Sequence, residues 1–237
     1  MNKSISVVLP VYNEEEILER SVKTLVDFAS ARFDSRWELV IADNFSTDRT
    51  SEIGRDLEKR YDRVRYVRID QKGVGAALKG AWGASSSDIL SYIDADLPFP
   101  LETLCELCGE VEKGYDIAIG SRYVRGGNYE INLPRKILSR IFRCWIRVLF
   151  SVNFHDSCGI RAMKRDVCHR LLPQLQNDDW FFGDELLIRA ARSGYMIKEV
   201  PVSAFYDQSR KSKVRIMKTI VNYIKVSILF RCRLMKT

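Results

Sequence analysis

The chain has 237 residues, 46% of them hydrophobic, and a formal net charge of +7. This length and composition are enough for one large α/β domain. Neither a secretory leader nor an apolar run of about 18 residues is visible, so we expect a cytoplasmic protein without a membrane-spanning helix. Six cysteines include one C-x-x-C pair, Cys105 and Cys108, with no second pair and no nearby histidine. A zinc or redox site is therefore not predicted.

The first half of the chain alternates short apolar runs with helix-length amphipathic segments. Residues 5–11 and 89–93 are runs that predict buried strands, and further strands are predicted at 38–43, 64–69 and 116–121. The segments between them predict helices at about 14–30, 48–60, 74–82 and 101–112. Strands separated by helices imply parallel pairing, with helices on both faces of one sheet. The sequence therefore predicts an α/β domain over residues 1–213 with a mostly parallel central sheet.

A glycine-rich stretch, residues 73–80, follows the third predicted strand. It has two interpretations: a dinucleotide-binding loop, or a tight strand-to-helix turn whose small residues allow close packing. The spacing is not G-x-G-x-x-G, and the stretch does not follow the first strand. The tight turn is therefore the favoured interpretation.

Polar residues follow four of the predicted strands, at the edge where ligands collect in parallel sheets. The most informative cluster is Asp94-Ala95-Asp96, after the strand 89–93. Two carboxylates two residues apart on a strand point the same way and repel unless a cation lies between them. Mg²⁺ or Mn²⁺ bound to a diphosphate would meet that need, and a simple turn is the alternative. The other clusters are Asn13-Glu14, Asp43-Asn44 and Ser121-Arg122.

Short motifs occur in a specific order along the chain. Pro10-Val-Tyr-Asn-Glu14, Asp43-Asn-Phe-Ser-Thr-Asp48, Asp94-Ala-Asp-Leu97 and Gly120-Ser-Arg-Tyr123 together resemble the successive motifs of family 2 glycosyltransferases with the GT-A fold. The series continues through Arg135-Lys-Ile-Leu-Ser139, Asp156-Ser-Cys-Gly-Ile-Arg161, Phe182-Gly-Asp-Glu-Leu-Leu187 and Ser212-Lys213. The whole series, over residues 4–215, is similar to the branch of dolichyl-phosphate mannose synthases and dolichyl-phosphate glucosyltransferases.

This resemblance implies a Rossmann-like GT-A fold and a nucleotide-sugar donor. It implies that Asp94 and Asp96 hold a divalent metal, with Ala95 between them at the diphosphate. Arg122 and Lys213 would supply further cations to the leaving group. The alternative interpretation of Tyr12 and Glu14 is the start of a helix that Asn13 caps. The implied nucleotide-binding residues are Pro10, Tyr12, Glu14, Asp43 and Asn44.

The donor stays open between the GDP-mannose and UDP-glucose types. Pro98 stands where mannose synthases usually have Gln, and Asp207 stands in place of an Arg. The segment Asp156-Ser-Cys-Gly159 looks closer to the glucosyltransferases. The resemblance implies transfer of one hexose, with inversion at the anomeric carbon, to a polyisoprenyl phosphate such as dolichyl phosphate.

The acceptor side rests on two pairs of residues. Arg135 and Ser139 lie one helical turn apart at the start of a basic amphipathic stretch, and we predict that they hold the acceptor phosphate. By resemblance, Asp184 and Glu185 lie near the acceptor. The acidic pair could orient basic groups or act as a general base toward a hydroxyl. Its alternative interpretation is a helix amino terminus that favours negative charge.

Two basic amphipathic segments, 135–150 and 214–237, complete the chain. Residues 208–237 contain nine Lys or Arg and no acid, and no nucleic-acid motif accompanies them, so no nucleic-acid partner is expected. A broad apolar face beside basic residues is typical of a helix in a membrane interface. The alternative for 135–150 is a core helix with a solvated basic edge. The basic stripe in 135–150 consists of Lys136, Arg140, Arg143 and Arg147.

We therefore expect a peripheral enzyme on the cytoplasmic face of a membrane, in contact with lipid or with a small membrane partner. Two other classes remain open. One is a family 2 enzyme that acts on a glycan or protein hydroxyl, with Asp184 or Glu185 as a true base. The other is a non-catalytic, membrane-associated scaffold with a GT-A fold.

Overall fold

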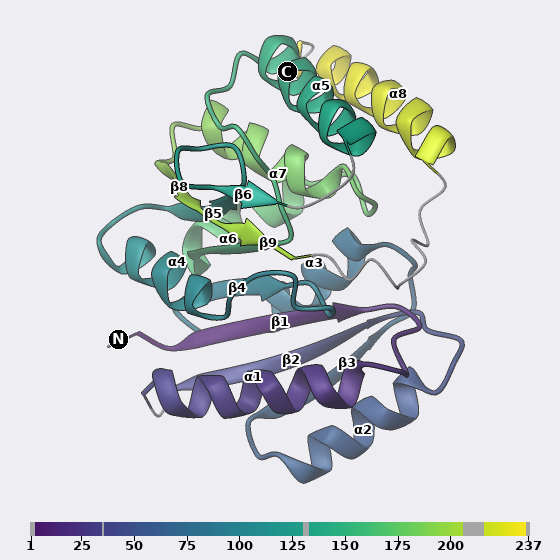
Figure 1. The fold of residues 1–237 in the computed structure, drawn as a ribbon, viewed down its shortest axis with the longest axis vertical. Coiled ribbons are helices and arrows are strands. Elements are labelled where there is room, and N and C mark those ends of the chain that lie inside the picture. The colour runs from purple at the N-terminus through teal and green to yellow at the C-terminus, as the bar shows by residue number, and fades with distance from the viewer. Residues whose placement is uncertain (1–2, 35, 130–132, 206–215, 236–237) are drawn as a thin grey trace.

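The computed structural model describes residues 3–34, 36–129, 133–205 and 216–235 (Figure 1). Its centre is a seven-stranded sheet with the strand order β3-β2-β1-β4-β7-β5-β8. The strands are β1 (Ile5–Val11), β2 (Trp37–Asn44), β3 (Val64–Ile69), β4 (Ile89–Ile93), β5 (Ile117–Ser121), β7 (Ile160–Lys164) and β8 (Ile197–Pro201). A small second sheet pairs β6 (Asn128–Tyr129) with β9 (Ser203–Ala204).

The helices lie on both faces of the sheet, as the alternating pattern predicts. They are α1 (Leu18–Arg32), α2 (Thr50–Arg60), α3 (Val74–Ala84), α4 (Glu102–Glu112), α5 (Leu133–Phe150), α6 (Arg165–Leu171), α7 (Phe182–Arg192) and α8 (Ile216–Leu234). A short 3₁₀ turn, Leu172–Gln174, follows α6.

The sheet is mostly parallel and contains one strand of opposite direction among those described. β1 pairs in parallel with β2 and β4, and β5 pairs in parallel with β8. β7 lies between β4 and β5 and is antiparallel to both. Its amino end therefore lies at the edge where β4 and β5 have their carboxyl ends. This reversal brings residues 156–159 beside the ends of β4 and β5.

Side-chain alternation along the strands builds two hydrophobic cores, one on each face. Val7 and Leu9 of β1 pack in the core beneath α1 and α4, whereas Val8 packs in the core beneath α3 and α7. Helix α1 contributes one apolar stripe at the spacing of a helical face. That stripe consists of Leu18, Val22, Leu25 and Ala29.

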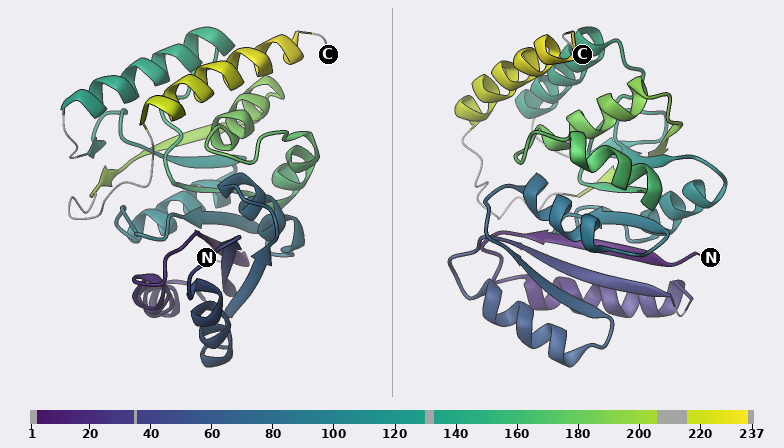
Figure 2. Two further views of the ribbon diagram at one scale, coloured as in Figure 1. Left: turned by 90° about the vertical axis from the view of Figure 1, so that its right-hand side faces the viewer. Right: turned by 180° about the vertical axis from the view of Figure 1, so that it is seen from behind.

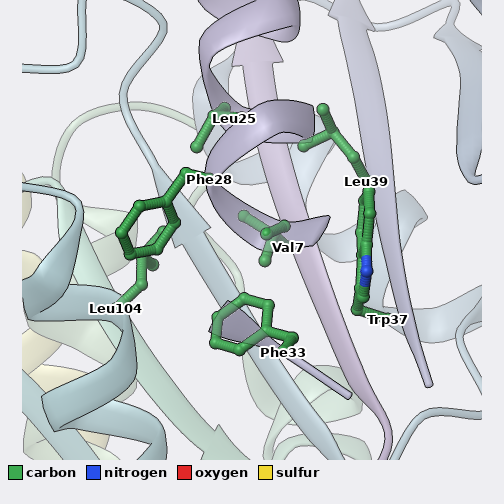
Figure 3. Close-up of a pocket in the computed structure, with 8 residues that line it drawn as sticks. Val7, Leu25, Phe28, Phe33, Trp37, Leu39 and Leu104 are labelled. Atoms are coloured by element: carbon green, nitrogen blue, oxygen red, sulfur yellow. The ribbon is translucent and has the colours of Figure 1, made fainter. Parts of the chain in front are cut away.

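The first core contains a small gap between α1, α4 and the sheet (Figure 3). Its volume is about 10 Å³, at the lower limit for a single water, and apolar side chains such as Leu25, Phe33 and Leu104 line it. Trp37, at the start of β2, also borders the gap. The gap is therefore a packing defect near the beginning of the strands and not a substrate site.

Helices α5 and α8 lie side by side at one end of the molecule, over α7 (Figures 1 and 2). Their contact is largely aromatic: the rings of Phe150 and Phe230 are 5.5 Å apart, and those of Phe142 and Tyr223 are 5.0 Å apart. Phe181, just before α7, packs against both Tyr223 and Phe230. Among the described residues, no helix has the length and apolar character needed to cross a membrane.

Candidate active site

The loops that follow β1 and β2 are bound to each other by side-chain contacts. The Asn13 N–H donates to Ser46 Oγ at 3.0 Å, and the Asn13 side-chain oxygen accepts from the Thr47 N–H at 2.8 Å. The Glu14 N–H donates to Thr50 Oγ1 at 2.8 Å. Asn13 has a left-handed φ of 54°, and α1 begins only at Leu18 without a side-chain cap. The interpretation of Asn13 as a helix cap is therefore wrong, because this residue instead braces the neighbouring loop.

Asp43, at the end of β2, is completely buried and heavily hydrogen-bonded. Its carboxylate accepts from the Ser46 N–H at 2.9 Å and from the hydroxyls of Ser51 and Tyr66, both at 2.6 Å. Burial raises the pKa of Asp43, but these hydrogen bonds outweigh burial and lower it overall. Arg68 also lies 3.4 Å from this carboxylate. Asp43 is thus a buried negative charge, fixed in place at the end of β2.

The glycine-rich stretch forms a tight turn against the neighbouring loops. Gly73 has a φ of 141°, and its N–H donates to the side-chain oxygen of Asn44 at 2.5 Å. A side chain at Gly75 would overlap the ring of Phe182. The tight-turn interpretation is therefore confirmed.

Lys72, just before this turn, is a residue of the site that the motifs did not indicate. Its Nζ donates to Tyr12 Oη at 2.8 Å and lies 4.2 Å from the centre of the Tyr12 ring. This contact brings a cation beside the aromatic ring of the Pro10–Glu14 motif.

The two acidic residues of the D-x-D motif lie directly after β4. Asp94 is mostly buried and Asp96 is exposed. The Ala95 carbonyl between them accepts from the buried Ser21 hydroxyl at 2.7 Å, which attaches the turn to α1. Burial and then the charge of Asp96 raise the pKa of Asp94 to about 7, against the opposing charges of nearby arginines. A cation between the carboxylates would relieve both effects.

A divalent metal fits this pair. Within the described part of the chain, no group of three or more His, Cys, Asp or Glu side chains gathers as a metal site. Two carboxylates are nevertheless the donor set that Mg²⁺ uses when phosphate oxygens and waters complete its shell. The residues present therefore suit a metal that arrives with a diphosphate.

Gly159 supplies the space for Asp94. The Asp94 N–H donates to the Gly159 carbonyl at 3.1 Å, and any side chain at Gly159 would overlap the Asp94 carboxylate. The close approach of β7 to β4 therefore requires glycine at this position.

Arg122, after β5, is oriented by Asp156. Its Nε and Nη2 each donate to a different oxygen of the Asp156 carboxylate at 2.8 Å, and its backbone N–H adds a third bond at 2.9 Å. Asp156 is completely buried, so this is a bidentate ion pair in a largely water-excluded setting. The guanidinium is thus held rigidly at the same edge as Asp94.

Asp184 and Glu185 lie in the first turn of α7, as their helix-terminus interpretation expects. Glu185 is buried and accepts from the Asn177 N–H and from Arg189 Nε, both at 2.9 Å. Asp184 accepts from Arg143 of α5 at 2.6 Å. Burial raises the pKa of Asp184, but the Arg143 charge and its hydrogen bonds outweigh burial and lower it overall.

Ser139 on α5 lies close to the Arg122 segment, since Tyr123 Oη donates to Ser139 Oγ at 2.6 Å. Arg143 leaves the predicted basic stripe, because it points inward to Asp184 and its side chain is only 14% exposed. The side chain of Arg135 and the whole of Lys213 and Asp207 lie outside the described residues.

The family model of glycosyl transferase family 2 matches residues 6–172, which include every motif described above up to Arg161. The chain belongs to glycosyl transferase family 2. It is 31% identical to glycosyltransferase AglD from Haloferax volcanii over 221 residues, and this match covers 92% of this chain and 35% of that protein. It is 37% identical over 138 residues to a dolichol-phosphate mannosyltransferase from Pyrococcus furiosus, covering 57% of this chain and 38% of that protein.

A third family 2 relative is the polyprenol monophosphomannose synthase of Mycolicibacterium smegmatis, 33% identical over 206 residues, with 83% of this chain and 76% of that protein covered. The chain thus spans little more than a third of the length of the first two relatives and about three quarters of the third.

Solved structures support the GT-A fold of this family 2 member. Glucosyl-3-phosphoglycerate synthase from Mycobacterium tuberculosis, in complex with Mn²⁺, UDP and glucosyl-3-phosphoglycerate, superposes with a TM-score of 0.70 at 24% identity, covering 98% of this chain and 80% of that one. The same enzyme with Mn²⁺ and UDP-glucose gives 0.69 at 20% identity, with 98% and 79% covered. The predicted GT-A fold, with its mostly parallel sheet, is confirmed.

Proposed function

We propose that this chain transfers a hexose from a nucleotide sugar to a polyisoprenyl phosphate, with a divalent metal at Asp94 and Asp96. One observation carries the proposal: the carboxylate pair and the rigid Arg122–Asp156 ion pair share one sheet edge, where Gly159 keeps space for Asp94. Two relatives, the polyprenol monophosphomannose synthase and the dolichol-phosphate mannosyltransferase, support the acceptor class.

On the donor side, the loops after β1 and β2 suit a nucleoside. Tyr12 and Phe45 offer rings, and Glu14 and Asn44 offer polar groups near Pro10 at the end of β1. Phe45 is 43% exposed and lies beneath Arg68, whose guanidinium is 5.6 Å from its ring. Asp43 holds these loops together and would meet the base or ribose with the oxygen that it shares with Ser46. The metal, when bound, would neutralise charge on the diphosphate leaving group.

Arg122 and Lys72 supply the protein's own cations to that leaving group. The Arg122 side chain is held in one orientation, because Nε and Nη2 each donate to the Asp156 carboxylate. Preorganised charge of this kind stabilises developing negative charge at little cost of reorganisation. Lys213, which precedes α8 in the sequence, would add a further cation.

The state of the two acids of α7 favours a phosphate acceptor over a hydroxyl acceptor. Attack by a hydroxyl requires a general base, and a carboxylate with a lowered pKa, such as Asp184, is a weak one. Glu185 is buried and bound by a loop and by Arg189. A phosphate monoester has a second pKa near 6, so it is already a dianion for much of the time at neutral pH. Positioning would then carry the reaction, with direct displacement and inversion.

Helix α5 would bring the acceptor phosphate to this edge. Ser139 contacts Tyr123, the neighbour of Arg122, so an acceptor phosphate at Ser139 would lie beside the donor cations. We assign Arg135, one turn earlier on the same helix, to the same phosphate. The acceptor KM should therefore rise more than the donor KM in Arg135→Ala, and equal effects on both would argue against the assignment.

The outer face of the α5–α8 pair would rest on the membrane. Basic residues at its margin, such as Arg140, Arg147 and Lys225, would add roughly 1 kcal/mol each near an anionic surface. Such an arrangement is that of a peripheral protein on the cytoplasmic leaflet. The exposed large apolar residues of α5 and α8, which would form this face, are Ile137, Ile141, Trp145, Val148, Val221, Ile224, Ile228 and Leu229.

The proposed function is tested with a donor panel. GDP-mannose and UDP-glucose, both radiolabelled in the sugar, are offered with dolichyl phosphate and Mn²⁺, and the product is extracted into organic solvent. Binding calorimetry with GDP, UDP and Mn²⁺ accompanies the assay. A non-catalytic scaffold would bind no nucleotide, whereas a hydroxyl-acting enzyme would bind nucleotide without forming a lipid product.

A further inference from the structure

Side chains from three separate helices meet in one buried cluster. Arg143 of α5 donates to Asp184 of α7 through Nη1 at 2.6 Å and through Nη2 at 3.2 Å. Arg143 Nη2 also donates to Tyr223 Oη of α8 at 2.7 Å, and that hydroxyl donates to Asp184. We call Arg143, Asp184 and Tyr223 the clasp, because they join α5 and α8 to α7. Figure 1 shows α7 beneath the two helices.

The clasp continues into the sheet edge through Ser157. Arg143 Nη1 donates to Ser157 Oγ at 2.7 Å. The Ser157 N–H donates to the Asp156 carboxylate at 2.8 Å, and Asp156 is the partner of Arg122. Hydrogen bonds, joined through the covalent bonds within Ser157, therefore link Tyr223 to the Arg122 guanidinium.

The cluster is more than an anchor for packing. Aromatic contacts already hold α8, since Tyr223 packs on Phe142 and Phe181, and Phe230 is buried. Hydrogen bonds to buried charges are directional, so they specify one arrangement where apolar packing tolerates several. Nη2 of Arg143 contacts Asp184 of α7 and Tyr223 of α8. Nη1 contacts Asp184 and Ser157. A shift of α8 would thus change how Arg143 holds the 156–157 segment.

We infer that the clasp and Ser157 are positioning residues for Arg122: the seating of α8 against α5 sets the position of Asp156 and, through it, of the Arg122 guanidinium. This inference rests on the proposed function only in that Arg122 acts on the donor. It assigns to α8 a part in setting turnover that is separate from any contact with lipid.

The activity test uses Tyr223→Phe, which removes the hydroxyl but keeps the ring, and Ser157→Ala, which removes the Oγ that accepts from Arg143 and keeps the backbone N–H bond to Asp156. Each variant should lower kcat by about fivefold to tenfold while binding of nucleotide stays within about twofold of the parent. The double variant should be no slower than the slower single variant, because both changes interrupt one path. Tyr195→Phe, a partly buried tyrosine of the same core cluster, is the control and should keep the parent kcat. Losses in kcat that multiply in the double variant, or a lowered Tm with unchanged kcat, would overturn the inference.

A second test does not depend on activity. The backbone N–H groups of Arg122 and Ser157 both donate to Asp156, so their hydrogen exchange reports how often these two bonds open. Exchange in peptides that contain these two residues should be faster in Tyr223→Phe than in the parent and unchanged in β1 and β2. Unchanged exchange at Arg122 and Ser157 would refute the clasp as a positioning device. If the parent transfers no sugar to lipid, the proposed function fails, and this exchange experiment still decides on the clasp.

Discussion

The Asp94 carboxylate lies where a side chain at residue 159 would be, and it fits there only because Gly159 has no side chain. Asp94 directly follows β4 and Gly159 directly precedes its antiparallel neighbour β7, and the Asp94 N–H donates to the Gly159 carbonyl at 3.1 Å. The geometry of the D-x-D motif is thus set as much by the start of β7 as by the end of β4.

Gly159→Ala should therefore displace the Asp94 carboxylate and weaken metal-dependent nucleotide binding by at least about tenfold, or ~1.4 kcal/mol. Calorimetry with UDP or GDP, with and without Mn²⁺, measures the effect. Gly109→Ala is the matched control, because Gly109 lies in α4 with open space around it. Alanine there should leave binding unchanged and stabilise the helix by about 0.5–1 kcal/mol. Binding at the parent level in Gly159→Ala would show that Asp94 can move without loss.

Asp156→Asn should destabilise the fold and slow the reaction together. The substitution leaves the Arg122 guanidinium without its buried counter-charge, and removing one partner of a buried ion pair costs about 3–5 kcal/mol. Urea unfolding gives the free energy of unfolding, and kcat is measured on the folded fraction. Asp166→Asn, which removes an exposed partner of Arg170, is the control and should change stability by under about 1 kcal/mol. Equal stability of the two variants would argue against a tight Arg122–Asp156 pair.

Acidification should expose the contribution of Asp43. Its pKa in the folded protein lies below the ordinary value of 3.8, because hydrogen bonds from Ser46, Ser51 and Tyr66 outweigh burial. A lowered folded pKa means that Asp43 stabilises the fold above pH 3.8 and that this stabilisation is lost as the pH falls through the folded pKa. The free energy of unfolding should therefore fall less steeply below about pH 4 in Asp43→Asn than in the parent. Identical slopes in urea titrations at several pH values would contradict this assignment.

The outer face of α5 and α8 can be tested without disturbing the site. Ile141→Glu and Val148→Glu place charges on side chains that are 58% and 76% exposed, so the fold should tolerate them. Sedimentation with anionic liposomes should decrease in both variants, and added salt should weaken binding of the parent. Met196→Glu, at an exposed site before β8, should sediment like the parent. Full liposome binding by the α5 variants would move the lipid contact elsewhere.

Point substitutions are preferable to truncation for this surface. Phe230 of α8 is buried against Phe150 and Phe181, so removal of α8 would expose those rings to water. A truncated chain could lose stability for that reason alone, whatever the role of the outer face.

Much of the first half of the fold follows from local sequence patterns. The predicted strands at 64–69 and 89–93 coincide with β3 and β4. Residues 89–93 form a compact, buried run, and residues 64–69 are rich in β-branched and aromatic side chains, which favour strands. The helices predicted from residues 14 and 48 begin later, at Leu18 and Thr50. The residues before them are held in loops, because Asn13 in the loop after β1 is hydrogen-bonded to Thr47 in the loop after β2.

The missed features depend on long-range contacts. Strand β7 is only five residues long and runs against its neighbours, and no local pattern encodes its direction. Arg143 has the spacing of a solvated basic stripe, yet it turns inward because α7 presents Asp184 to it. The motif Asp156-Ser-Cys-Gly159 signalled importance, but only the fold reveals that its ends contact Arg122 and Asp94.

Metal-dependent transfer to a lipid phosphate is measured most directly as radiolabelled sugar in the lipid extract, compared between the parent and Asp96→Asn, with and without EDTA. We expect that one of GDP-mannose or UDP-glucose labels dolichyl phosphate. EDTA or Asp96→Asn should abolish this transfer while the circular dichroism spectrum stays that of the parent. Label in the lipid that persists in EDTA, or full transfer by Asp96→Asn, would contradict a metal at the carboxylate pair. Absence of lipid label with both donors would contradict the proposed acceptor.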